Sequence, residues 1–154
     1  MKKDNWIIKA FLMTFFIALI FSAISNVIVN GCNNFVILII LCLVFILIGI
    51  FFDIIGTAVL TANEASFHAK SSKKIKGSKE GVYLVKNSST ISSICNDVIG
   101  DICGIVSGSV AAMLSILVSN KTNFSLVIVT LLISSLVSSL TVGGKAIGKK
   151  FAIR

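Results

Sequence analysis

The sequence has no proline, and only 13% of its 154 residues are charged. Acidic residues are the scarcest of the charged ones, with six Asp and Glu against fourteen Lys and Arg. Without proline, any bend in a helix has to come from Gly or Ser. A soluble domain of this length has too small an interior for a hydrophobic fraction of 56% and a mean hydropathy of +1.02. The composition therefore predicts an integral membrane protein.

Four apolar stretches can each cross a hydrocarbon layer of about 30 Å, which takes about 20 helical residues. They cover residues 6–29, 35–60, 91–118 and 124–142. Between the second and third lies a lysine-rich segment, 63–90, that reads as two short helices joined at Gly77 and lying along the membrane surface. We therefore predict an all-α integral membrane protein with about four transmembrane helices and a basic juxtamembrane helical hairpin.

The basic residues are distributed unevenly over the connecting segments. They precede the first span, fill the hairpin and follow the fourth span. Lys121 is the single basic residue in the loop between the third and fourth spans, on the opposite side of the membrane. By the positive-inside rule, both termini and the hairpin are cytoplasmic, and Cys32 and Lys121 face outward. The net charge of +8 thus indicates topology and contact with anionic membrane lipids. Basic and aromatic residues do not alternate as in sites that stack bases, so no nucleic acid is expected as a partner.

Residues 1–30 form an N-terminal transmembrane helix, and residues 31–154 form the remaining domain. The basic start and apolar core of the first helix also fit a cleaved signal peptide. Lys9 interrupts the apolar run, and small residues do not form a clean A-x-A cleavage site. Both features favour an uncleaved signal anchor in a multi-pass protein of the cell membrane.

The four cysteines do not form a C-x-x-C pair, and His68 is the only histidine. A zinc or redox site is therefore not expected. Cys42, Cys95 and Cys103 fall in spans, where small thiols pack between helices. The sequence also lacks a recognisable nucleophile and base, so an enzyme is not predicted.

The third span carries an unusual polar pattern over residues 92–109, SSICNDVIGDICGIVSGS. On an ideal helix, Asn96, Gly100, Gly104 and Gly108 form one stripe beside Asp97 and Asp101. Glycine at this spacing lets another helix backbone approach closely. We therefore expect this small, polar face to point inward, with Val98 and Ile102 on the opposite side.

Packing alone does not require carboxylates, and charged groups within a membrane are costly. Hard divalent cations such as magnesium prefer carboxylate, amide and hydroxyl oxygens. The oxygen-bearing residues of the second and third spans are candidate metal ligands of this kind: Asp53, Thr57, Ser92, Asn96, Asp97 and Asp101. The alternative is a buried polar network in which Asp97 or Asp101 pairs with a lysine from the hairpin or the C-terminus.

Three segments occur in a distinctive order, FFDIIGTAVLTANEASFHAKSSKKIKG, STISSICNDVIGDICG and LTVGGKAIGKK. Their order resembles the transmembrane domain of the CNNM/CorC (CorB-like) magnesium transporters, in a short form without the CBS domains. Thr57 and Ala58 match the T-A of the family's first motif, and Gly144 and Lys149 match the outer residues of its last motif, G-E-x-x-P-K. Ser92, Ser93 and Asn96 resemble the Ser and Asn motif of the helix after the hairpin.

The chain departs from the family at several of these positions. Asp53 and Gly56 stand where the family has Ser and Glu, and Gly148 replaces the proline of the last motif. Lys145 falls where the family has a glutamate that helps to hold the dehydrated magnesium ion. An ammonium group there would repel a cation, or would take its place against Asp97 or Asp101.

Two functions follow from these observations. The resemblance implies a homodimeric divalent-cation transporter or efflux component, with magnesium or cobalt as the transported ion. The departures favour the alternative, a non-transporting membrane interaction or regulatory module that retains the helix packing and serves a separate cytoplasmic or membrane partner. A third reading, in which Asp97 and Asp101 hold a catalytic metal, lacks the extended motif of lipid phosphotransferases.

Overall fold

The computed structural model describes residues 2–31, 34–73 and 75–153, and within this part the chain is helical and has no strand. The predicted all-α architecture is therefore confirmed. In chain order the elements are α1 (Lys2–Gly31), α2 (Phe35–Thr61), α3 (Glu64–Ser72), α4 (Ser78–Lys86), α5 (Ser88–Ser93), the π-helical turn η1 (Ile94–Gly100), α6 (Asp101–Thr122) and α7 (Leu126–Ala152).

Four helical segments of the described chain are long and apolar enough to cross a membrane: Ile7–Val29, Phe35–Thr61, Ser88–Thr122 and Leu126–Ala152. The third consists of α5, η1 and α6 in one continuous helix. The last two segments are longer than the expected spans, because polar residues at their ends continue the helix beyond the apolar stretch. The chain is thus a multi-pass membrane protein.

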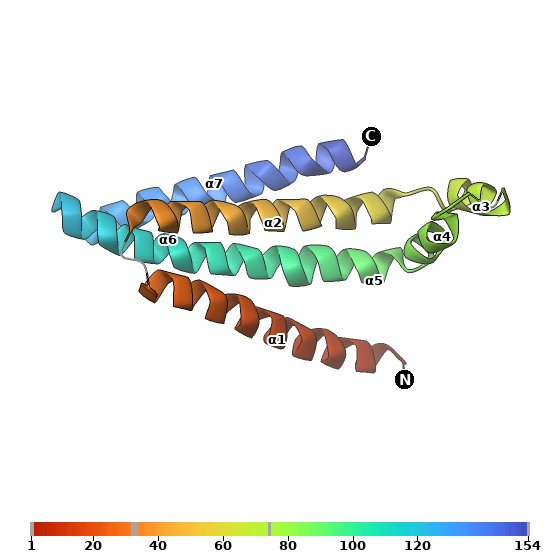
Figure 1. Cartoon of the computed structure of the whole chain (residues 1–154), viewed down its shortest axis with the longest axis horizontal. Coiled ribbons are helices and arrows are strands. Elements are labelled where there is room, and N and C mark those ends of the chain that lie inside the picture. The colour runs from red at the N-terminus through yellow and green to blue at the C-terminus, as the bar shows by residue number, and fades with distance from the viewer. Residues whose placement is uncertain (1, 32–33, 74, 154) are drawn as a thin grey trace.

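The long helices lie side by side (Figure 1). Helices α2, α6 and α7 contact one another, and α1 packs against α6 and η1 while diverging from them toward the N-terminus. Both termini lie at the same end of the bundle as α3 and α4. The connections before α2 and after α6 lie at the opposite end, as expected for four antiparallel crossings.

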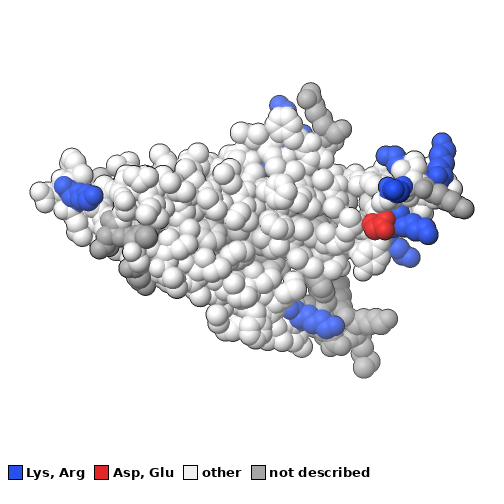
Figure 2. All heavy atoms as spheres, viewed as in Figure 1, with Lys and Arg blue, Asp and Glu red and all other residues white. Residues whose placement is uncertain are grey.

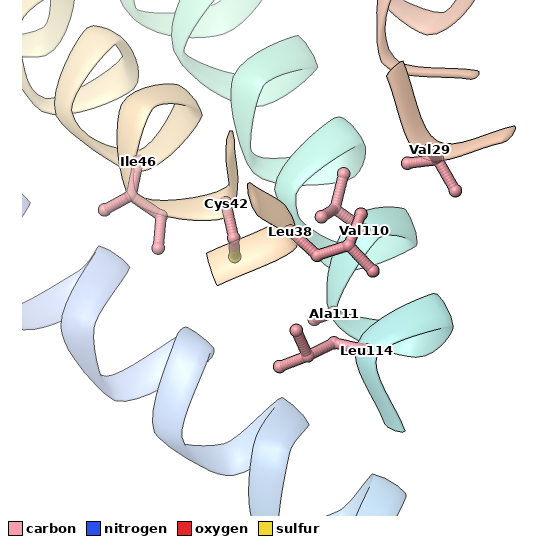
Figure 3. Packing of buried hydrophobic residues seen from close by; sticks show 7 residues of the cluster. All are labelled: Val29, Leu38, Cys42, Ile46, Val110, Ala111 and Leu114. Carbon is pink, nitrogen blue, oxygen red and sulfur yellow. The ribbon is translucent and has the colours of Figure 1, made fainter. Parts of the chain in front are cut away.

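Two apolar clusters hold the bundle together. Figure 3 shows the first, in which residues of α1, α2 and α6 meet: Val29, Leu38, Cys42, Ile46, Val110, Ala111 and Leu114. The second joins α1, α2 and the third span, with Phe21 packed edge to face against Phe45 at 5.9 Å between ring centroids. Most of the surface of α1 and α7 remains apolar and exposed, as suits helices that face lipid.

The basic hairpin has the predicted arrangement of two helices with a turn at Gly77. This glycine adopts a left-handed conformation with φ of 81°, which L side chains rarely adopt. The ring of Phe67 in α3 covers Gly81 in α4 and joins the two helices. Figure 2 shows lysines gathered at this end of the molecule, whereas Lys121 lies in the last turn of α6 at the other end. Lys74 and Arg154 lie outside the described residues.

Cys42, Cys95 and Cys103 are buried and free, which confirms the expectation of small thiols packed between helices. The thiol of Cys42 donates to the carbonyl oxygen of Ser107 on the third span at 3.6 Å. Cys32 lies outside the described residues.

Candidate functional site

The inward face of α2 near the hairpin end is lined by small and polar residues. Gly49, Asp53, Gly56 and Thr57 are buried there, one helical turn after another. The Thr57 hydroxyl donates its proton to the backbone carbonyl of Asp53 at 2.8 Å, and its oxygen remains an uncharged acceptor. Of the candidate ligands on α2, Asp53 therefore offers the charged group.

Asn96 of η1 lies against this face of α2. Its side-chain oxygen occupies the space that a Cβ atom at Gly56 would need. The side-chain nitrogen donates to the Ser92 hydroxyl at 3.2 Å. Asn96 thus meets α2 at Gly56, one turn from Asp53, and Ser92 is its hydrogen-bond partner.

Two side-chain oxygens in this region are buried without a hydrogen-bond partner in the described chain. They are Oδ2 of Asp53 and Oδ1 of Asn96. A buried acceptor without a donor costs about 1–3 kcal/mol. Such atoms are rare in folded proteins, and a bound water, an ion or a functional role accounts for most of them.

The Asp53 carboxylate has one cationic neighbour in the described structure, Lys149 of α7. Its Nζ atom lies 3.6 Å from Oδ2 of Asp53. This distance suits an ion pair but exceeds that of a good hydrogen bond. The Asp53 side chain is 4% exposed and that of Lys149 is 50% exposed, so the lysine reaches a buried acid from the surface.

A second ion pair joins Lys145 to Asp101 at the start of α6. The Lys145 Nζ atom lies 3.7 Å from Oδ1 of Asp101 and near Gly100. Here the lysine is the more buried partner, at 21% exposed against 67% for the carboxylate. Two of the lysines of α7, Lys145 and Lys149, therefore pair with carboxylates of two different helices.

Glycines fix the position of α7 against α2. A Cβ atom at Gly144 or Gly148 would collide with Ile50 or Ile54, which pack directly onto these glycines. Each glycine precedes one of the paired lysines in GGKAIGKK, so the Gly-Lys step recurs at four-residue spacing. Close approach of the two backbones at the glycines brings the lysines within reach of the acids.

The two pairs lie about one helical turn apart along the bundle, since Gly100 beside Asp101 contacts Gly49, which lies one turn before Asp53. Asp53 lies about 27 Å from the start of α2, Lys145 about 29 Å from the start of α7, and Asp101 about 32 Å from the end of α6, at 1.5 Å per residue. A hydrocarbon layer is about 30 Å thick. These charges therefore fall at the hydrocarbon boundary nearest the hairpin, where lysine side chains extend toward headgroups.

The stripe expected on the third span is only partly inward, and this corrects the sequence-based interpretation. Gly100 is buried against Gly49, but Asp97 and Asp101 are exposed, while Val98 and Ile102 are buried against α1 and α2. The reason is that α1 also packs on the third span, so Val98 and Ile102 are buried as well and the carboxylates lie on the face that remains exposed. The π-helical turn over Ile94–Gly100 further shifts the residues that follow it from their ideal-helix positions.

Further along this span, Gly104 and Gly108 face open space. A Cβ atom at either position would meet nothing within 4 Å among the described residues. Together with Ser134 and Ser138 of α7, they line a groove of about 210 Å³ between α6 and α7. Gly104 and Gly108 thus line a groove on the surface of the bundle and do not form a helix contact within it.

The six candidate ligands do not converge on one point. Asp53, Thr57, Ser92 and Asn96 lie between α2 and the third span, whereas Asp97 and Asp101 are exposed on another face. The described residues contain no group of three His, Cys, Asp or Glu side chains that could hold a metal. One buried carboxylate beside an ammonium group fits a monovalent positive group better than a divalent ion.

Sequence reasoning missed the role of Lys149 as the partner of the buried acid. The sequence analysis expected Lys145 to take the place of a cation, beside Asp97 or Asp101, whereas the buried acid Asp53 pairs with Lys149. The signal that could have found Lys149 is the repeated Gly-Lys step, since both lysines lie on one face of α7. The pairing of Lys145 with Asp101 agrees with the lysine partner of the alternative polar network, but Asp101 is exposed and not buried as that network required.

No protein-family model, no curated protein and no solved structure matches the chain. The likeness to the CNNM/CorC transmembrane domain accordingly stays a prediction from the sequence.

Proposed function

We propose that this chain is a non-transporting membrane interaction or regulatory module, in which the chain's own lysines neutralise Asp53 and Asp101. The observation that carries the proposal is the Lys149–Asp53 ion pair, 3.6 Å long, at the one buried carboxylate of the described structure. A transport pathway needs its charged ligands free to exchange ions with water. Here an ammonium group on a packed helix already supplies the compensating charge.

The module's location follows from its charges. We propose the cell membrane, with both termini and the α3–α4 hairpin in the cytoplasm, because the lysines gather at the end that holds all three. At this end the hairpin exposes Ile75, Tyr83 and Leu84 next to lysines. Exposed apolar side chains beside lysines suit anionic lipid headgroups or a separate cytoplasmic partner.

The proposed partner within the membrane is a second copy of the chain. The groove between α6 and α7 is open at Gly104 and Gly108 and is lined by serine hydroxyls. Small residues of this kind let helices of two copies approach closely. A homodimer that packs at this groove would also cover the polar residues that line it.

Divalent-cation transport, with magnesium or cobalt as the transported ion, is the second candidate. The observation that favours it is the pair of buried oxygens without hydrogen-bond partners, on Asp53 and Asn96. An ion that displaced the Lys149 ammonium would find a carboxylate, an amide oxygen and the Ser92 hydroxyl on adjacent elements.

Magnesium binding and flux separate the two functions. For the module, the unfolding midpoint of the purified protein does not change with millimolar magnesium, and liposomes that contain the protein take up no magnesium. Asp53→Asn and Asp97→Asn serve as matched variants, since one removes the buried acid and the other an exposed one. Saturable stabilisation of the wild type by magnesium, lost in Asp53→Asn and kept in Asp97→Asn, would instead establish a cation site.

A further inference from the structure

We propose that the buried carboxylate of Asp53 forms a binding site for a primary ammonium group. In the chain itself the side chain of Lys149 fills this site, and a free alkylammonium ion can fill it when the lysine is absent. This inference rests on the ion pair that also carries the proposed function, and it adds the class of ligand that the site accepts.

The first argument is the hydrogen-bonding capacity of the site. Oδ2 of Asp53 and Oδ1 of Asn96 are buried acceptors that lack donors in the described chain. The Asn96 oxygen lies at Gly56, one helical turn from Asp53 on the same face of α2. An ammonium group carries three N–H donors and no acceptor, so it adds no unsatisfied acceptor to this region.

The second argument is charge. Asp53 is the buried carboxylate, while Asp101 is 67% exposed and has its own partner in Lys145. A single positive charge beside Asp53 makes the site neutral. A divalent ion would leave one excess positive charge in a poorly hydrated region, which is costly.

The third argument is access. Because half of the Lys149 side chain is exposed and the Asp53 side chain is almost completely buried, the lysine stem marks a route from the surface to the acid. Lys149→Ala removes three carbon atoms and the ammonium nitrogen from this route. The removed atoms correspond to n-propylammonium, which is therefore the probe that fits the vacated space.

The test is thermal unfolding of the full chain, purified in lipid nanodiscs. Lys149→Ala should lower the unfolding midpoint by about 6–20 °C, because it leaves a buried carboxylate without a partner. Added n-propylammonium chloride should restore at least half of this loss along a saturable curve. Sodium chloride and tetramethylammonium chloride at the same ionic strength should not, since neither cation has an N–H donor.

Two variants serve as controls. Lys150→Ala removes the next lysine, which is exposed and makes no ion pair within the described residues, so its midpoint should neither fall nor respond to the amine. The double variant Asp53→Asn with Lys149→Ala retains the vacated space but lacks the acid. It should be more stable than Lys149→Ala without amine and should show no response to n-propylammonium.

Three results would overturn the proposal. A lower midpoint in Lys149→Ala that no amine restores would show that Lys149 only neutralises Asp53, which leaves the proposed function intact. Stronger recovery with magnesium than with n-propylammonium would contradict both the ligand class and the proposed function. If Lys149→Ala does not fold, it is expressed and purified in n-propylammonium throughout, and failure to obtain folded protein there overturns the proposal as well.

Discussion

The side-chain oxygen of Asn96 occupies the space beside Gly56 in which any other residue would place its Cβ atom. This contact joins α2 to the π-helical turn of the third span at the level of the candidate site. Because the Asn96 side chain and the Cβ atom of Cys95 both pack directly onto Gly56, this glycine sets how closely the two helices approach.

Gly56→Ala should therefore lower the free energy of unfolding by about 1–3 kcal/mol through overpacking. Chemical or thermal unfolding in detergent measures the effect. Gly143→Ala is the matched control, since a Cβ atom at Gly143 meets nothing within 4 Å in the described structure. Alanine in a helix interior should stabilise that variant by up to about 1 kcal/mol. An equal loss in both variants would show that Asn96 does not contact Gly56.

Gly104→Leu should leave the fold of the single chain unchanged, because Gly104 faces open space. The added side chain should instead fill the groove between α6 and α7 and prevent a second copy from packing there. Cross-linking in membranes and light scattering of the detergent-solubilised protein report the oligomeric state. A dimer that survives Gly104→Leu would place the interface elsewhere, and a monomeric wild type would reject the homodimer.

The two ion pairs should differ in their contribution to stability. Lys145→Ala should cost no more than about 1 kcal/mol, because the carboxylate of Asp101 stays accessible to solvent or headgroups. Lys149→Ala should cost about 3–5 kcal/mol, because Asp53 is then a buried charge without a partner. Parallel unfolding curves measure both. A larger loss for Lys145→Ala would contradict the burial of Asp53 at this site.

Thiol labelling tests the proposed orientation. Cys42, Cys95 and Cys103 are buried, so a membrane-impermeant maleimide added to intact cells should modify the wild type at Cys32 only. Cys32→Ser should abolish the signal. Ser72→Cys in that background should react after the cells are opened and not before, because Ser72 is exposed on the hairpin. Labelling of Ser72→Cys on intact cells would reverse the topology.

The sequence alone determined the number of spans, the helical hairpin and the clustering of lysines at one end. Each of these depends on local composition: apolar runs of membrane length, Gly77 at the turn, and lysines in the connecting segments. Local patterns of this kind do not require knowledge of which helices pack together. The structure therefore agrees with these three predictions, except that the spans extend further at their polar ends.

The tertiary structure decided which polar residues meet. An ideal-helix pattern predicts that Asp97, Asp101 and Gly104 point inward, but α1 covers the face with Val98 and Ile102, both carboxylates are exposed, and Asp53 of α2 is the buried acid. The partner of that acid depends on how α7 packs, since Ile50 and Ile54 of α2 contact Gly144 and Gly148 and thereby bring Lys149 to Asp53. Helix periodicity cannot supply this pairing, because it follows from contacts between residues nearly a hundred positions apart in the chain.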